Sequence, residues 1–204
     1  MTKDKLMTKD KQKASAPQRI RRITFLAMFV ALIAVCAQIT LPMPSGVSFT
    51  LQTFAVALCG YLLGAKYGAA ALAVYLLLGA VGAPVFSAFQ GGFHVLAGKT
   101  GGYLWGFLPM AALCGLAHFG KGRVLPYLWG LPGLMMCHLC GTLQNMFLAG
   151  GGFWALLMVY SVPYLLKDAL GLVAAALLAH RLRPVLEKYL VLSPVRAKQN
   201  MIQR

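Results

Sequence analysis

Long apolar segments, separated by short clusters of glycine, proline and charged residues, follow one another from residue 23 onward. They predict helices near 23–40, 51–64, 67–83, 101–119, 125–149 and 154–182. Most approach the ~20 residues that a helix needs to cross the hydrocarbon core of a bilayer. The second is short, and the fifth carries Pro126 and Pro132, so we expect it to be kinked or interrupted. The pattern predicts an all-α integral membrane protein, a bundle of six transmembrane helices.

The composition indicates a surface that faces lipid. Of the 204 residues, 59% are hydrophobic and 11% are charged, whereas a soluble domain carries roughly 25% charged residues. So few charges cannot cover a surface that faces water. We therefore expect a basic, disordered tail at 1–22, a six-helix transmembrane domain at 23–183 and a second tail at 184–204.

The positions of the basic residues predict how the helices are oriented. The net charge is +15, and of the 19 Lys and Arg residues eight precede residue 23 and six follow residue 180. Lys and Arg residues on tails that flank apolar segments are typical of signals for cytoplasmic orientation. Nucleic-acid binders instead place their basic residues on a folded face. Six helices with a cytoplasmic N-terminus put 17 of the 19 on the inside. We expect both termini in the cytoplasm, with anionic lipid headgroups as partners and no nucleic acid.

Lys167 and Asp168 are charged residues in the interior of the sixth predicted helix. A charge at mid-membrane costs roughly 2.5–3.5 kcal/mol, so such residues mark functional sites or neutralising pairs. Neighbours on a helix point about 100° apart, so we expect each to find its partner on another helix, in water or in a ligand. Gln144 and Asn145 either share this polar site or form interhelical hydrogen bonds.

Several other motifs are incomplete. Gly98-Lys99-Thr100 ends like a phosphate-binding loop, but Phe93 stands where that pattern requires glycine, so we expect no ATPase site. Cys137 and Cys140 have the spacing of half a zinc site without a second pair, so we expect the segment, His138 included, to pack in the bundle and no metal to bind. No nucleophile stands beside a base, which argues against an enzyme.

Small residues on the first helix, Ala27, Ala31 and Ala34, form a stripe. Small residues four apart let helices approach closely, either within the bundle or against another membrane protein. The outer segments at 41–53 and 84–103 are rich in proline and glycine. Glycine-rich backbone at membrane depth is tolerated where it is buried or lines a cavity. This arrangement suits the capture of an external solute.

Three stretches carry a family resemblance: PSGVSFTLQTFAVALCGYLLGAKYGAAALAVYLLLGAVGAPVF (44–86), GGFHVLAGKTGGYLWGF (91–107) and, less closely, VPYLLKDALGLVAAALLA (162–179). The chain resembles the BioY family, biotin-specific substrate-capture subunits of energy-coupling-factor (ECF) transporters. The resemblance implies a six-helix bundle in the plasma membrane of a prokaryote, with biotin as transported ligand and no cofactor. It also implies docking through Ala27 and Ala31 onto a transmembrane coupling protein that carries two ATPase subunits.

The resemblance also implies which residues contact biotin. The loop after the first helix would roof the site, the glycine-rich loop would form its wall, and the last-helix acid would be Asp168. With the other polar residues named above, the expected set is Phe49, Thr50, Gln52, Gln90, Gly91, Gly92, Tyr103, Gln144, Asn145, Lys167 and Asp168. Many relatives place a lysine one turn after the acid, where this chain has Gly171. Capture of thiamine or riboflavin and a stand-alone secondary transporter remain the alternatives.

Overall fold

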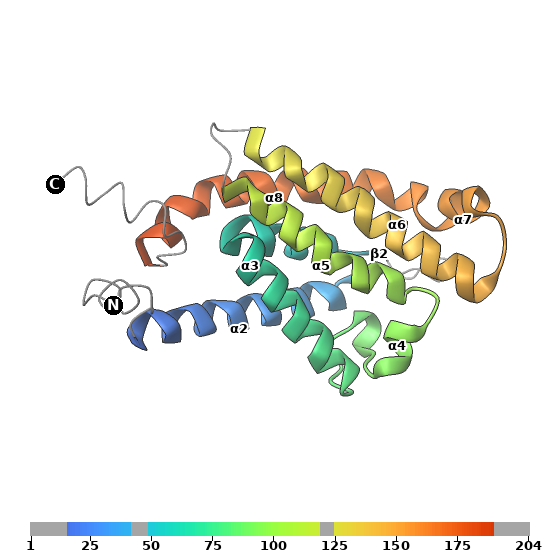
Figure 1. Cartoon of the computed structure of the whole chain (residues 1–204), viewed down its shortest axis with the longest axis horizontal. Coiled ribbons are helices and arrows are strands. Elements are labelled where there is room, and N and C mark those ends of the chain that lie inside the picture. The colour runs from blue at the N-terminus through green and yellow to red at the C-terminus, as the bar shows by residue number, and fades with distance from the viewer. Residues whose placement is uncertain (1–15, 42–48, 119–124, 190–204) are drawn as a thin grey trace, which may run out of the picture.

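The structure, a computed structural model, describes residues 16–41, 49–118 and 125–189. Within them the chain is almost entirely helical, and long helices run side by side (Figure 1). The long helices are α2 (Ala16–Gln38), α3 (Gln52–Ala80), α5 (Gly101–Gly115), α6 (Gly130–Ala149) and α8 (Val162–Tyr189). Shorter elements are β1 (Thr40–Leu41), β2 (Phe49–Thr50), η1 (Ser87–Phe89), α4 (Phe93–Ala97), η2 (Leu116–His118), η3 (Leu125–Trp129) and α7 (Phe153–Tyr160).

The second and third predicted helices are two halves of α3, joined by a sharp bend rather than by a loop. The bend lies at Gly64, whose φ of 80° and ψ of 170° are not helical. A Cβ added at Gly68 would lie 3.1 Å from the Cα of Gly60. In a straight helix two residues eight apart are separated by about 12 Å along the axis. The chain therefore reverses its direction within α3. Gly64 stands at the bend because residues with a side chain rarely adopt its positive φ.

Two expected boundaries differ from the structure. The predicted sixth helix is broken at Ser161 into α7 and α8, because Pro163 lacks an N–H and its ring excludes a continuous helix from the preceding turn. The helices also extend beyond the predicted domain, α2 beginning at Ala16 and α8 ending at Tyr189. Residues 16–22 and 184–189, expected in tails, are therefore helical. The expected interruption at the start of the fifth helix is present as η3, which leads into α6.

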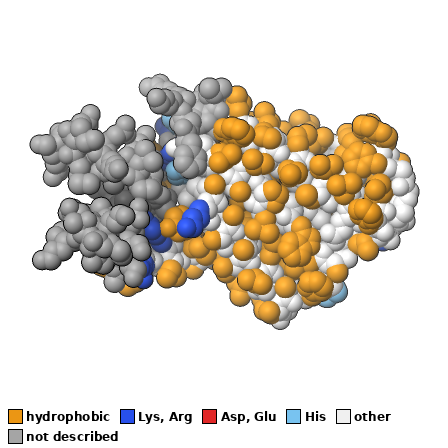
Figure 2. Space-filling view, in the orientation of Figure 1, with side chains coloured by type: hydrophobic (Ala, Val, Ile, Leu, Met, Phe, Trp, Pro, Cys, Tyr) orange, Lys and Arg blue, Asp and Glu red, His pale blue; other side chains and the backbone are white. Residues whose placement is uncertain are grey.

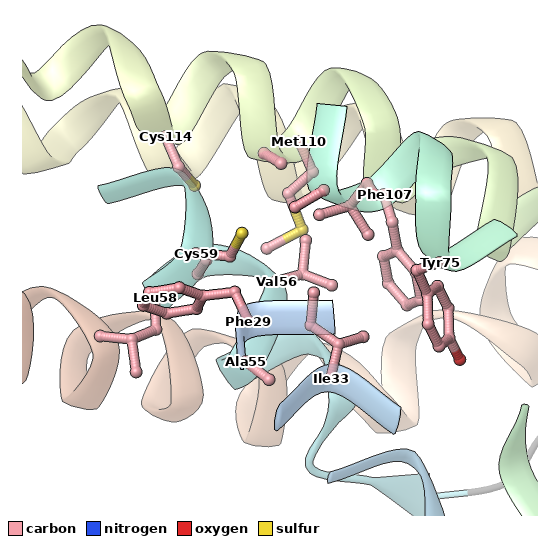
Figure 3. Close-up of a cluster of buried hydrophobic side chains, with 14 of the residues drawn as sticks. Phe29, Ile33, Ala55, Val56, Leu58, Cys59, Tyr75, Phe107, Met110 and Cys114 are labelled. Carbon is pink, nitrogen blue, oxygen red and sulfur yellow. The ribbon is translucent and has the colours of Figure 1, made fainter. Parts of the chain in front are cut away.

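The core is formed around α3, which packs against α2, α5 and α8. Figure 3 shows side chains from α2, α3 and α5 meeting in one apolar cluster, among them Phe29, Ile33, Val56 and Met110. Helices α3 and α5 approach so closely that a Cβ at Gly60 would lie 2.4 Å from the carbonyl oxygen of Ala111. The close approach brings the helix ends that carry the polar residues within reach of one another.

The surface is apolar over most of the bundle. Figure 2 shows hydrophobic side chains across the visible face, with Lys and Arg gathered at the end where α2 begins and α8 ends. Of the described residues, three helical segments are long and apolar enough to cross a membrane: Pro17–Gln38, Gln52–Ala80 and Val162–Leu186. Tyr127–Ala149 and Phe153–Tyr160, bent by 119°, make up a fourth. The chain is thus a multi-pass membrane protein.

Candidate functional site

A cavity of about 150 Å³ lies among the ends of α3, α5, α6 and α8. The lining of the cavity includes Val95 of α4, and α4 lies at the end of the bundle opposite the start of α2 and the end of α8 (Figure 1). Its walls combine aromatic and apolar side chains with a few polar ones, as in small-molecule sites. The residues that line it are Thr50, Gln52, Thr53, Phe86, Ser87, Ala88, Gln90, Val95, Thr100, Tyr103, Leu104, Phe107, Cys137, His138, Tyr160, Tyr164, Lys167 and Asp168.

Lys167 and Asp168 contact each other directly, which was not predicted, and each also has a partner outside α8, as expected. Lys167 Nζ lies 2.5 Å from Asp168 Oδ1. The long, flexible lysine side chain spans the angle that separates two neighbours on a helix. Lys167 Nζ also donates a hydrogen bond of 2.9 Å to the carbonyl oxygen of Thr50. It lies 4.9 Å from the centroid of the Phe49 ring, a cation–π distance. The lysine thus ties α8 to the segment before α3.

His138 is buried in the bundle, as its predicted packing role requires, and it also lies beside Asp168, which was not predicted. Its Nε2 lies 3.3 Å from Asp168 Oδ2, and its side chain is 6% exposed. Its ring packs edge-on against Tyr103, with centroids 5.8 Å apart. The imidazole lines the cavity together with the side chain of Cys137. No group of three metal ligands occurs among the described residues.

The loop after α3 is held over the cavity by polar side chains from α2 and α3. Gln38 Nε2 donates to the carbonyl oxygen of Phe86 (3.0 Å), and Gln38 Oε1 accepts from the N–H of Phe89 (2.8 Å). Tyr75 accepts a hydrogen bond from Gln52 Nε2 (2.8 Å) and donates one to the carbonyl oxygen of Val85 (2.9 Å).

The same loop contains two consecutive non-glycine residues with positive φ. Ala88 and Phe89 both have φ of 56°. Left-handed conformations of residues other than glycine are unfavourable and persist where the surrounding contacts enforce them. The hydrogen bonds from Gln38 and Tyr75 supply such contacts. The loop therefore enters the cavity wall in one defined shape.

A network of hydroxyl groups joins Tyr103 of α5 and Thr142 of α6 to the break between α7 and α8. Tyr103 donates to the carbonyl oxygen of Tyr160 (2.8 Å), and its hydroxyl also lies 3.0 Å from Ser161 Oγ. Ser161 Oγ is 3.0 Å from Thr142 Oγ1 on α6. The network fixes the orientation of the Tyr103 ring, which faces the cavity. Tyr103 is one of the expected site residues.

The structure brings some expected residues into the cavity and places others outside its lining. The expected residues Thr50, Gln52, Gln90, Tyr103, Lys167 and Asp168 line it. Phe49 is not part of the lining, although its ring contacts Lys167. Gly91 packs instead against the carbonyl oxygens of Gly82 and Ala83, where a Cβ would clash. Gly92 has φ of 104° and donates a hydrogen bond to the carbonyl oxygen of Gly79. Both glycines shape the loop.

The fifth predicted helix supplies two further residues with different surroundings. Gln144 Nε2 donates to the carbonyl oxygens of Leu96 (2.8 Å) and Gly98 (2.7 Å), so it fixes α4 to α6. This is the interhelical alternative stated for Gln144. Asn145 is fully buried, and neither atom of its amide has a hydrogen-bond partner among the described residues. Neither residue is part of the cavity lining.

One face of α2 is buried against the bundle, and the small residues Ala27 and Ala31 lie on its other, exposed face. Phe29, Val30 and Ile33 are buried against the bundle, whereas Ala27 and Ala31 lie on the exposed face of α2. Ala27 and Ala31 therefore do not pack within this bundle, and contact with another membrane protein is the alternative that remains for them.

Sequence reasoning missed several lining residues besides His138. Thr53, Phe86, Tyr160 and Tyr164 lie at helix ends or in loops without a motif of their own. A signal was available for His138, because a histidine inside an apolar helix must find a polar partner and Asp168 is the one intramembrane acid. For the aromatic residues no sequence signal separates a cavity wall from a packed core.

Comparisons with known proteins converge on one family. The model of the BioY family matches residues 7–188 of the chain. The Biotin transporter BioY of Thermotoga maritima is 42% identical over 165 residues, which cover 80% of this chain and 96% of that protein. The Probable biotin transporter BioY of Pyrococcus horikoshii is 37% identical over 166 residues, covering 81% of this chain and 98% of that one.

A solved structure shares the fold. It is the crystal structure of the S-component for biotin from an ECF-type ABC transporter, and it superposes with a TM-score of 0.77. The match covers 84% of this chain and 95% of that chain at 22% sequence identity. At this identity the likeness establishes the helical arrangement and leaves ligand contacts to be argued from this chain.

Proposed function

The chain belongs to the BioY family, and we propose that it captures external biotin as the substrate-specific subunit of an ECF-type vitamin uptake transporter. The observation that carries the proposal is the cavity with Lys167 and Asp168 on one wall and aromatic side chains on the others. Intramembrane charges that face a cavity mark substrate sites. The relatives named above are biotin transporters, which supports biotin as the solute.

The cavity chemistry suits the parts of biotin. Its ureido ring offers N–H donors, its thioether ring is apolar, and its flexible chain ends in a carboxylate. Asp168 would accept hydrogen bonds from the ureido N–H groups, a charge-assisted bond stronger than a neutral one. Lys167 would bind the ureido carbonyl oxygen or the carboxylate. Phe86, Tyr103 and Phe107 would pack against the apolar ring.

The topology that fits this function has six transmembrane segments and both termini in the cytoplasm. The segments would be α2, the two halves of α3, α5 with η2, η3 with α6, and α8. The start of α2 and the end of α8 lie at one end of the bundle, where the described Lys and Arg residues gather. The cavity lies toward the opposite end, which would face outside. An excess of Lys and Arg residues on the cytoplasmic side is the usual orientation signal.

Energy for uptake would come from other subunits. We expect a transmembrane coupling protein to dock on the exposed face of α2 at Ala27 and Ala31 and to carry two ATPase subunits. Small residues on a lipid-facing helix allow close approach of another helix. The chain itself would act as a transport subunit without an ATPase site. Its membrane would be the plasma membrane of a prokaryote.

Ligand identification tests the proposal most directly. The protein, purified gently in detergent, should release biotin in mass spectrometry of its extract, and the ligand-free protein should bind biotin in calorimetric titration. Thiamine and riboflavin should not compete, because neither carries the bicyclic ureido ring or the carboxylate of biotin. Strong binding of either vitamin and none of biotin would refute the assignment.

Uptake assays separate the transport classes. In a host that lacks the coupling and ATPase subunits, we expect biotin binding without concentrative uptake. Adding the coupling module should restore uptake. Full uptake by the chain alone would favour a stand-alone secondary transporter.

A further inference from the structure

The empty cavity is balanced in charge, and an anionic ligand would disturb the balance. Among the described residues that line it, Lys167 is the one Lys or Arg and Asp168 is the one acid. Their side chains are 16% and 6% exposed and in direct contact, so together they carry no net charge. A carboxylate that enters adds a negative charge in a place where bulk water screens charges weakly.

His138 is the group in the cavity that is able to supply a balancing positive charge. Its Nε2 lies 3.3 Å from Asp168 Oδ2, and neither ring nitrogen has an aligned hydrogen bond among the described residues. Histidine is the side chain that ordinarily changes charge between pH 5 and 8. The other titratable groups on the cavity walls are Tyr103 of α5, Cys137 of α6, Tyr160 of α7, and Tyr164, Lys167 and Asp168 of α8.

We infer that His138 takes up a proton when a carboxylate ligand enters the cavity, so that ligand binding is linked to proton uptake. The inference rests on the proposed capture of biotin and deepens it. The proton comes from solvent and forms an N–H bond at the unprotonated ring nitrogen, and no other bond changes. Lys167 and protonated His138 then balance Asp168 and the ligand carboxylate.

The linkage has a measurable consequence for affinity. Over the pH range in which binding takes up one proton, the dissociation constant rises by about tenfold per pH unit, and it levels off at lower pH, where the proton is already bound in the ligand-free protein. Biotin methyl ester, which has no carboxylate charge, should show almost no such dependence. A purely structural His138, packed against Tyr103, predicts the same pH profile for biotin and for its ester.

Calorimetry on the full chain in detergent counts the protons. Binding heats at about pH 7, in the histidine range, are compared between phosphate and Tris buffers, whose heats of ionisation differ. We expect uptake approaching one proton per biotin and close to none for the ester. Equal proton numbers for both ligands, or none for biotin, would overturn the inference. Failure of biotin to bind at all would instead refute the proposed function.

Proton uptake measured on the variant His138→Gln tests whether this residue takes up the proton. At saturating ligand the proton number does not depend on affinity, so a weaker variant still gives an answer. We expect the uptake to disappear in His138→Gln and to persist in Tyr160→Phe, which alters another titratable group of the same cavity. Uptake that persists in His138→Gln would show that another group, such as Asp168, takes the proton. If that variant does not fold, the comparison of biotin with its ester decides alone.

Discussion

Replacement of Asp168 by asparagine separates a ligand contact from a neutralising pair. Asparagine keeps the size of the side chain and removes its charge. The ammonium of Lys167, 16% exposed, would lose the opposite charge of Asp168 and keep its hydrogen bond to the carbonyl oxygen of Thr50. Removing one partner of a buried ion pair costs about 3–5 kcal/mol. Because Lys167 keeps a hydrogen bond and some exposure, we expect a loss of stability of about 3 kcal/mol, at the lower end of that range.

The loss of affinity follows from the hydrogen bonds to the ureido group. A hydrogen bond to a charged acceptor contributes about 1.5–3 kcal/mol, and each 1.4 kcal/mol is about a factor of ten in the dissociation constant. Asp168→Asn should therefore bind biotin about ten- to a hundredfold more weakly. Titration calorimetry measures the affinity, and thermal unfolding of the same preparation measures the stability.

The double variant Lys167→Gln with Asp168→Asn is the matched control. It removes both charges, so it should recover most of the stability lost by Asp168→Asn, because no unpaired ammonium remains. Its biotin affinity should stay low, since the carboxylate is still missing. A single variant with reduced stability and unchanged affinity would show that the two residues neutralise each other and do not hold the ligand, and it would refute the reasoning.

Three further predictions concern the docking face, the loop and the fold. Ala31→Trp on the exposed face of α2 should impair uptake in cells and leave biotin binding to the purified protein intact; loss of binding would contradict a docking role. Gln38→Ala removes two hydrogen bonds that hold the loop after α3, so affinity measured by calorimetry should fall about five- to thirtyfold, and an unchanged affinity would show that the loop keeps its shape without them. Gly64→Ala should lower the free energy of unfolding by about 1–3 kcal/mol because of its positive φ, whereas Gly152→Ala, with ordinary φ and open space around it, should not.

Most helices could be predicted from the sequence, because a helix that crosses lipid needs a long apolar segment, and such a segment is visible in the local sequence. Apolar length, proline and glycine together located α5 and α6 within a few residues. Long-range geometry was less accessible. The direct reversal at Gly64 and the break at Ser161 depend on how the segments pack against their neighbours. A glycine or a proline indicates that a bend is possible but does not give its angle.

The same division applies to the site. Charge in an apolar helix singled out Lys167 and Asp168, because such a residue carries an energetic cost that the sequence displays. The glycines of the outer loop were expected to face the ligand, and the structure places Gly91 and Gly92 in backbone packing. Glycine reports a need for space or for a positive φ, and both needs arise in a loop as well as in a cavity wall.

The contacts of Asp168 explain how one carboxylate would serve both the empty and the occupied cavity. An ionised carboxylate accepts hydrogen bonds at about four lone-pair positions. In the structure Oδ1 faces Lys167 and Oδ2 faces His138, one group on each oxygen. The remaining positions are available to the ureido N–H groups without separating the ion pair. The ligand would then add hydrogen bonds to a charge that is already neutralised, so binding would not include the cost of exposing a lone lysine to the apolar interior.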